Sequence, residues 1–184
     1  MPRSVRTFLP VVGDPTSLAR AFDGDPQRWL PAARQEGPSR WRIKAHAGSL
    51  SRPVMVTIGP PWRASRTYWR TVSWDPVDPQ DGAPTALDRF LPTLDGELGL
   101  HLRRGGPATL VLDARYQPPG GALGEAVDAL ALSRVARGTV ERFLEDVAAR
   151  LAAEALLVAP AGPNGERSAA RDLPEHDGAR TVHT

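Results

Sequence analysis

The sequence predicts an α+β domain in which a curved antiparallel sheet of six strands wraps around one long C-terminal helix. Short segments with alternating apolar residues recur along the chain, and a helical pattern almost free of breakers then runs from 122 to 157. Because this helix carries an apolar stripe along its length, it needs the apolar face of the preceding strands as its partner. We therefore expect a helix held against a concave sheet, with a ligand cavity between them.

Length and composition favour one domain and a tail. The chain has 184 residues, of which 41% are hydrophobic, which suits a single domain over 1–158. The remaining segment, 159–184, is rich in proline, glycine and charge and is expected to be disordered. The chain has no cysteine, which excludes disulfides and thiolate metal sites. It shows no signal peptide and no apolar run near the ~20 residues of a membrane span, so we expect a soluble cytoplasmic protein.

The N-terminal part predicts a strand followed by two short helices. Residues 4–12 form the first strand, at an edge of the sheet because Pro10 cannot donate a ladder hydrogen bond. Asp14-Pro15 and Asp25-Pro26 then begin one helix each, since aspartate caps the free amides and proline fits the first helical turn.

Five further strands follow, and their alternation assigns an inward face. The segments are 41–47, 53–59, 66–74, 94–103 and 108–116. For the last two strands the paired residue numbers should sum to 210 or 212 if their apolar faces match. A sum of 212 sets Glu97 opposite Arg115, whereas 210 sets it opposite Asp113. Like charges repel across a strand pair, so the prediction is 212.

The long helix should turn one broad stripe toward the sheet. A straight helix over 122–157 would span about 54 Å, longer than the roughly 40 Å of a compact domain of this size. Gly138 could supply a kink or a close backbone approach, and a break near Leu132-Ser133 is the alternative. The stripe consists of Leu123, Val127, Leu130, Ala131, Val135, Thr139, Phe143, Val147 and Leu151.

Residues suited to acid–base or metal chemistry are sparse. Two histidines, His46 and His101, have the outward parity of their strands, and the other two, His176 and His183, lie in the tail. We interpret them as surface residues, although histidine is the commonest general acid–base group. No spacing typical of metal ligands occurs, and nothing in the sequence requires a cofactor.

Arginines and tryptophans are the side chains that could add polarity to an apolar cavity. Arg70 and Arg134 could anchor a carboxylate or carbonyl group of a ligand. Arginines are usually exposed to solvent, however, and we expect both to be exposed. Trp41 could line a cavity or fill the core, whereas Trp29 is interpreted as structural. Trp69 and Trp74 have opposite parities, so one of them should lie on the outside of the sheet or at a bend. The fifth tryptophan is Trp62.

The middle of the chain is basic. Between residues 34 and 74 the only acidic residue is Glu36, which leaves a net charge of +7. A solvated sheet face explains this segment, and a surface for nucleic acid or an acidic partner is the alternative. The basic residues are Arg34, Arg40, Arg42, Lys44, Arg52, Arg63, Arg66 and Arg70.

Three local motifs resemble those of a known superfamily. They are 25–31 (DPQRWLP), 91–98 (LPTLDGEL) and 116–120 (YQPPG). With the β-α-α-β-β-β-β-β-α order, residues 4–155 resemble the START-like superfamily, also called SRPBCC, especially small actinobacterial members of its polyketide cyclase/dehydrase-like and lipid-transport branch. The resemblance implies the helix-grip fold and a hydrophobic ligand in the cavity between sheet and helix. Some members cyclise or aromatise polyketides there, and others only carry the ligand.

The leading hypothesis is binding or carriage of a lipid or polyketide-like molecule without covalent chemistry, by a monomer or homodimer that does not bind nucleic acid. Inward positions are almost all apolar, and Tyr116 is the main polar exception. The alternatives are a cyclase/aromatase-like enzyme, in which Tyr116 and a cavity arginine polarise a carbonyl, and an interaction protein that uses the basic segment. The expected lining is Trp41, Ile43, Val56, Ile58, Leu98, Leu100, Leu110, Leu112, Tyr116, Val127, Leu130 and Phe143.

Overall fold

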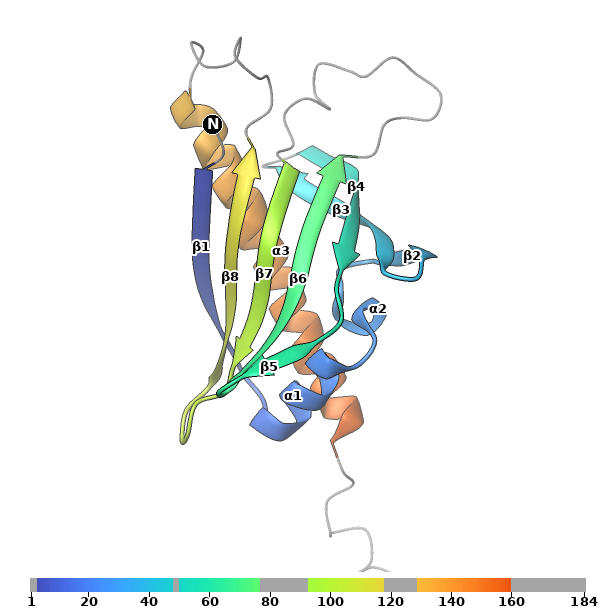
Figure 1. Ribbon diagram of the computed structural model, residues 1–184, viewed down its shortest axis with the longest axis vertical. Coiled ribbons are helices and arrows are strands. Elements are labelled where there is room, and N and C mark those ends of the chain that lie inside the picture. Colours follow the sequence, from blue (N-terminus) through green and yellow to red (C-terminus); the bar gives the residue numbers. More distant parts are fainter. Residues whose placement is uncertain (1–2, 48–49, 77–92, 118–128, 160–184) are drawn as a thin grey trace, which may run out of the picture.

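Eight strands form one antiparallel sheet, and the long helix α3 crosses one face of it in the computed structural model (Figure 1). The structure describes residues 3–47, 50–76, 93–117 and 129–159. The strand order is β1-β8-β7-β6-β4-β3-β2, with β5 paired to β6. The face that packs against α3 is called the inner face, and the opposite one the outer face. The elements are β1 (Arg3–Val11), α1 (Pro15–Asp23), α2 (Pro26–Trp29), β2 (Arg34–Gly37), β3 (Arg40–Ala47), β4 (Leu50–Ile58), β5 (Trp62–Ala64), β6 (Thr67–Pro76), β7 (Thr93–His101), β8 (Ala108–Gln117) and α3 (Ala129–Val158).

The α+β class and the two short helices are confirmed, but the predicted number of six strands is wrong. The additional strands are β2 and β5, which have four and three residues. β5 is exposed throughout and β2 nearly so, so neither shows the apolar alternation by which a strand is recognised. Both exist because a neighbouring long strand, β3 or β6, offers them hydrogen-bond partners.

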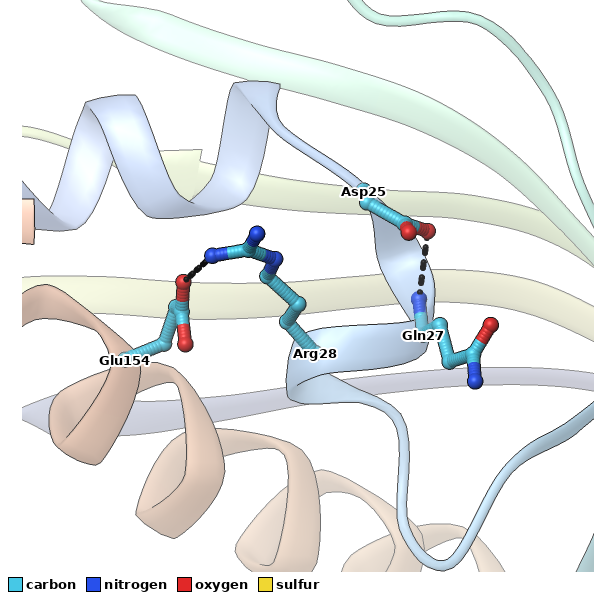
Figure 2. A network of polar contacts seen from close by, with 4 residues as sticks. All are labelled: Asp25, Gln27, Arg28 and Glu154. Atoms are coloured by element: carbon cyan, nitrogen blue, oxygen red, sulfur yellow. Dashed lines mark hydrogen bonds and ion pairs between the residues drawn. The ribbon is translucent and has the colours of Figure 1, made fainter. Parts of the chain in front are cut away.

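Both short helices begin as their sequences predict. Asp14 Oδ2 accepts a hydrogen bond from Ser17 N at 2.8 Å, and Asp25 Oδ1 accepts one from Gln27 N at 2.9 Å (Figure 2). The hydrogen bond from the Ser17 amide lowers the pKa of Asp14, because it stabilises the ionised carboxylate. The capping aspartates thus fix where α1 and α2 begin.

The inward parities are confirmed, but the register of the last hairpin is not 212. Glu97 pairs with Asp113, a sum of 210. The like charges are tolerated because Asp113 also faces Arg6 of β1, whose Nε lies 3.4 Å from Asp113 Oδ2. The same register sets Arg115 opposite Asp95. The strand that supplies Arg6 is distant in sequence, so the hairpin by itself could not reveal this compensation.

The helix α3 buries its predicted stripe as far as the structure describes it. Thr139, Phe143, Val147 and Leu151 are all buried. The helix is continuous through 132–133, so the suggested break there is wrong. Gly138 does not serve a close approach either, because a Cβ added to it would meet no atom within 4 Å.

Other predictions for this region lie outside the described residues. These are the helix start at 122, the positions of Leu123 and Val127, and the disordered tail after 159. The side chains of Leu130, Ala131 and Val135 are also outside the description.

The C-terminal end of α3 is tied to the two short helices. Arg28 Nη1 of α2 lies 2.9 Å from Glu154 Oε1, and the Glu154 side chain is only 9% exposed (Figure 2). The bond to Glu154 raises the pKa of Arg28. Arg20 Nη1 of α1 donates to Val158 O at 2.8 Å. These contacts fix the end of α3.

No helix among the described residues is long and apolar enough to span a membrane.

Candidate ligand-binding site between the sheet and α3

Five inward side chains form a row across the sheet. The register places Trp41 of β3 beside Val56 of β4, and Val56 beside Trp74 of β6. The row continues to Leu94 of β7 and ends at Tyr116 of β8. All five are buried, and we call them the aromatic row.

Helix α3 closes over this row through Phe143. The Phe143 ring meets the Trp74 ring edge to face, with centroids 5.2 Å apart. The neighbouring inward positions Gly96 and Ala114 are small, and a Cβ at Gly96 would lie 2.4 Å from Ala114 Cα. Strands β7 and β8 therefore approach closely beside the aromatic row, at a position that only glycine can occupy.

The other end of the inner face is core. Leu98, Leu100, Leu110 and Leu112 have no exposed surface and belong to one apolar cluster with residues of α1, α2 and α3. Helix α1 lies at this end, next to the β7–β8 hairpin (Figure 1). This end of the inner face is therefore packed apolar core.

The ten predicted lining residues whose side chains the structure describes are all buried; nine lie on the inner face of the sheet and Phe143 lies on α3. Their role as a cavity lining stays a prediction. Val127 lies outside the described residues, as does the side chain of Leu130. The ten are Trp41, Ile43, Val56, Ile58, Leu98, Leu100, Leu110, Leu112, Tyr116 and Phe143.

Arg70 is buried, so the expectation that it is exposed was wrong. It is 4% exposed, and it has the same strand parity as Val72 and Trp74. Its guanidinium donates four hydrogen bonds of 2.7–3.1 Å, three to the carbonyls of Phe22, Asp23 and Gly24 at the end of α1 and one to Gly59 O. Burial lowers its pKa because desolvation disfavours the charged form.

These bonds give Arg70 a structural task. Four of the five N–H groups of a guanidinium are engaged, and its plane also lies near the rings of Phe22 and Trp29. Arg70 therefore satisfies the C-terminal carbonyls of α1. The parity it shares with Val72 and Trp74 was the signal in the sequence for its burial. Arg134, by contrast, is exposed as expected.

A buried polar atom of the aromatic row has no partner. Trp41 is 3% exposed, and its Nε1 has no hydrogen-bond acceptor within the described part of the chain. A buried N–H without an acceptor costs about 1–3 kcal/mol, and a water or ligand normally satisfies such a group. Trp29 Nε1 of α2 also has no partner among the described residues, but Trp29 stacks on Phe22 of α1, with ring centroids 5.4 Å apart.

Few side chains suited to acid–base catalysis or metal binding occur at this site. His46 is exposed, and His101 lies on the outer face, where Nδ1 is 2.9 Å from Thr67 Oγ1. Among the residues that the structure describes, no group of three or more histidine, aspartate or glutamate side chains could hold a metal ion.

Solved structures with the same arrangement come from several organisms. A norcoclaurine synthase point mutant from Thalictrum flavum, in complex with a transition-state analogue, has a TM-score of 0.50 and 10% identity, covering 85% of this chain and 96% of that one. The Zhui aromatase/cyclase from Streptomyces sp. R1128 has a TM-score of 0.47 and 13% identity, over 85% of this chain and 92% of its own. A START superfamily protein from Mycobacterium smegmatis has a TM-score of 0.43 and 13% identity, over 85% and 99%.

At 10% identity, the likeness to the norcoclaurine synthase structure shows the fold alone. The chain has a START-like, helix-grip fold, as the resemblance of its motifs implied. No protein-family profile and no curated protein sequence matches it.

Proposed function

We propose that this protein binds a hydrophobic small molecule, lipid or polyketide-like, between the inner sheet face and α3, and carries it in the cytoplasm without covalent chemistry. The observation that carries the proposal is the unpaired Trp41 Nε1–H inside a buried, largely apolar row. A ligand that is largely apolar and offers one acceptor oxygen would satisfy this donor and bury its remaining surface against Val56, Trp74 and Phe143.

The alternative of a cyclase/aromatase-like enzyme has less support. It requires an arginine that acts together with Tyr116, but Arg70 is occupied by backbone carbonyls. Strand β7 lies between the strands that carry these two residues. Arg70 of β6 pairs with Leu98 of β7, whereas Tyr116 of β8 pairs with Leu94 of β7. Four residues along a strand correspond to about 13 Å, too far for both groups to act on one carbonyl.

The alternative of an interaction protein that uses the basic 34–74 segment also has less support. Arg42 pairs with Glu36 through two hydrogen bonds. Arg70 is buried, whereas Arg34 and Arg66 are exposed on different elements. Arg34, Arg40, Arg42 and Lys44 do share the outer face of β2 and β3. Glu36 neutralises part of this cluster by pairing with Arg42, and Arg70 contributes nothing to it, so the exposed positive patch is smaller than the net charge of the segment.

The first experiment is native mass spectrometry of the purified protein, followed by organic extraction of whatever co-purifies. A stoichiometric apolar ligand would support carriage. A clean apo mass, together with no binding of neutral hydrophobic probes, would overturn the proposal.

A matched pair of probes then tests the role of Trp41. 2-Acetylnaphthalene carries a carbonyl acceptor that 2-ethylnaphthalene lacks. The protein should bind the ketone more tightly, by about fivefold to tenfold for one buried hydrogen bond, and Trp41→Phe should remove this preference. Trp62→Phe, at a residue on β5 that is 39% exposed, is the control and should leave the preference unchanged. An equal preference in Trp41→Phe and in the unmodified chain would contradict the assignment.

A further inference from the structure

The outer face carries its own row of apolar residues, on the opposite side of the sheet from α3. The register places Phe8 of β1 beside Val111 of β8, and Val111 beside Gly99 of β7. The row continues to Trp69 of β6, which pairs in turn with Trp62 of β5. We call these five residues the outer row. Phe8 is 58% exposed, which is unusual for a large aromatic side chain on a sheet.

The row contains a hollow between two aromatic side chains. A Cβ added to Gly99 would lie 2.6 Å from Trp69 Cζ3, so the indole ring covers the glycine. Phe8 stands on the other side of Val111, and Arg6 lies over its ring at 5.5 Å from the centroid. The hollow measures about 360 Å³ and is lined by Arg6, Phe8, Thr67, Trp69, His101, Thr109 and Val111.

One rim of the hollow offers hydrogen-bonding groups. Thr109, His101 and Thr67 are cross-strand neighbours on β8, β7 and β6. Each lies two residues from the outer row along its strand, on the side of the β7–β8 hairpin. His101 Nδ1 lies 2.9 Å from Thr67 Oγ1, which fixes the orientation of the imidazole. Nε2 has no hydrogen-bond partner among the described residues and remains available to a ligand.

The charges around the hollow are asymmetric along the strands. Beyond the histidine rim, the exposed Arg66, Arg103 and Arg104 lie on two adjacent loops, which are joined by the hydrogen bond from Leu102 N to Arg66 O at 2.9 Å. Segments 59–74 and 98–112 contain no aspartate or glutamate. On the other side of the outer row, the next outward positions carry Asp113 and Glu97. Arg6 of β1 pairs with Asp113 on that side, which therefore carries two carboxylates and one cation, whereas the hairpin side carries three arginines. An anionic group is therefore favoured on the hairpin side.

We propose that this outer hollow binds a small planar aromatic anion, such as an aryl carboxylate. The ring would stack between Phe8 and Trp69, over Val111 as the floor of the hollow. The anionic group would point toward His101 and the hairpin arginines. The hollow has the volume of a small-molecule site, about 300–1,000 Å³. The site lies on the face opposite the aromatic row, so it does not depend on the function proposed above.

A simpler structural interpretation exists and makes a different prediction. A tryptophan that covers a strand glycine is a known stabilising device of sheets. Trp69 would then matter for stability, but Phe8 would have no role and no saturable binding would occur.

The test is an NMR titration of the 15N-labelled protein with 2-naphthoate and with the neutral 2-naphthalenemethanol. The proposal predicts saturable shifts at the Trp69 indole N–H and at the amides of Gly99 and Val111. The carboxylate should bind about fivefold to tenfold more tightly than the alcohol at low salt, since partly solvated charges contribute modestly. Shifts centred on Trp41 and Tyr116, equal affinity of the two probes, or no saturation would each overturn it.

Variants separate stacking from charge. Phe8→Ser changes an exposed side chain and should weaken naphthoate binding about tenfold, as expected for loss of one stacking partner. The double variant Arg103→Glu with Arg104→Glu should remove the preference for the carboxylate. Arg34→Glu with Arg40→Glu, on β2 and β3 at the far edge of the sheet, is the charge control and should leave that preference intact. Unchanged affinity in Phe8→Ser would contradict the site.

Single-stranded nucleic acid offers the same chemistry of flat rings and anionic groups, so the titration includes a ten-nucleotide oligodeoxythymidylate. Affinity comparable to or weaker than that of naphthoate supports a small ligand. Binding more than about a hundredfold tighter than naphthoate, and lost in the Arg103 and Arg104 double variant, would overturn the small-ligand assignment in favour of a polymer.

Discussion

Replacing Arg70 with methionine tests whether a buried arginine holds α1 against the sheet. Methionine is unbranched and fills much of the same space, so the change mainly removes the donor of four hydrogen bonds. The carbonyl of Phe22 is then left buried without a partner, whereas water can reach the other three acceptors in part. The expected result is a loss of stability and a loosened C-terminal end of α1.

The magnitude follows from the burial of each bond. A buried hydrogen bond from a charged donor is worth about 1.5–3 kcal/mol, and a partly exposed one about 0.5–1 kcal/mol. One bond of the first kind and three of the second give about 3–6 kcal/mol. Removing the guanidinium also returns its desolvation cost, which leaves a net loss of about 3 kcal/mol. For a domain of this size the midpoint of thermal unfolding should fall by about 9 °C.

Urea denaturation followed by circular dichroism measures this loss. The stability of Arg70→Lys should lie between that of the unmodified chain and that of Arg70→Met, because a single ammonium can reach only some of the carbonyls. Arg66→Met, an exposed arginine on the turn before β6, is the control and should stay within about 0.5 kcal/mol of the unmodified chain. A loss below about 1 kcal/mol for Arg70→Met would refute the structural role of Arg70.

Three further predictions concern two glycines, Gly138 and Gly96, and the N-cap residue Asp14. Gly138→Ala should stabilise the protein by about 0.5–1 kcal/mol in urea unfolding, because a Cβ there meets open space within a helix; a loss would mean that the position is packed. Gly96→Ala should cost more than about 2 kcal/mol, since its Cβ would lie 2.4 Å from Ala114 Cα; a neutral effect would refute the close approach. The folded pKa of Asp14 is lowered by the Ser17 amide. Its contribution to stability is therefore present above the unfolded pKa of about 3.9 and is lost as the pH falls through the folded value. Asp14→Asn should show a smaller loss of stability on acidification below about pH 4, and an unchanged pH profile would contradict this cause.

Strand alternation predicted which residues of the candidate site point inward, but no other property of the site could be predicted from the sequence. The inward position of Trp41 and Tyr116 follows from strand alternation and is confirmed. That the indole N–H of Trp41 has no acceptor depends on every atom packed around it, which alternation does not describe. The burial of Arg70 could have been read from its parity with Val72 and Trp74, but its partners are carbonyls at the end of α1, about 47 residues away in sequence.

The fold class, the capped starts of α1 and α2 and the inward faces of the long strands all follow from the sequence alone. These features depend on side-chain period and on neighbours within a few residues. The register of the β7–β8 hairpin, in contrast, depends on tertiary contacts, because Asp113 finds its counter-charge on Arg6 of β1. Tertiary packing likewise brings Phe8 and Trp69 to the same hollow on the outer face. Contacts between strands far apart in the chain depend on how the sheet closes, and no local pattern carries that information.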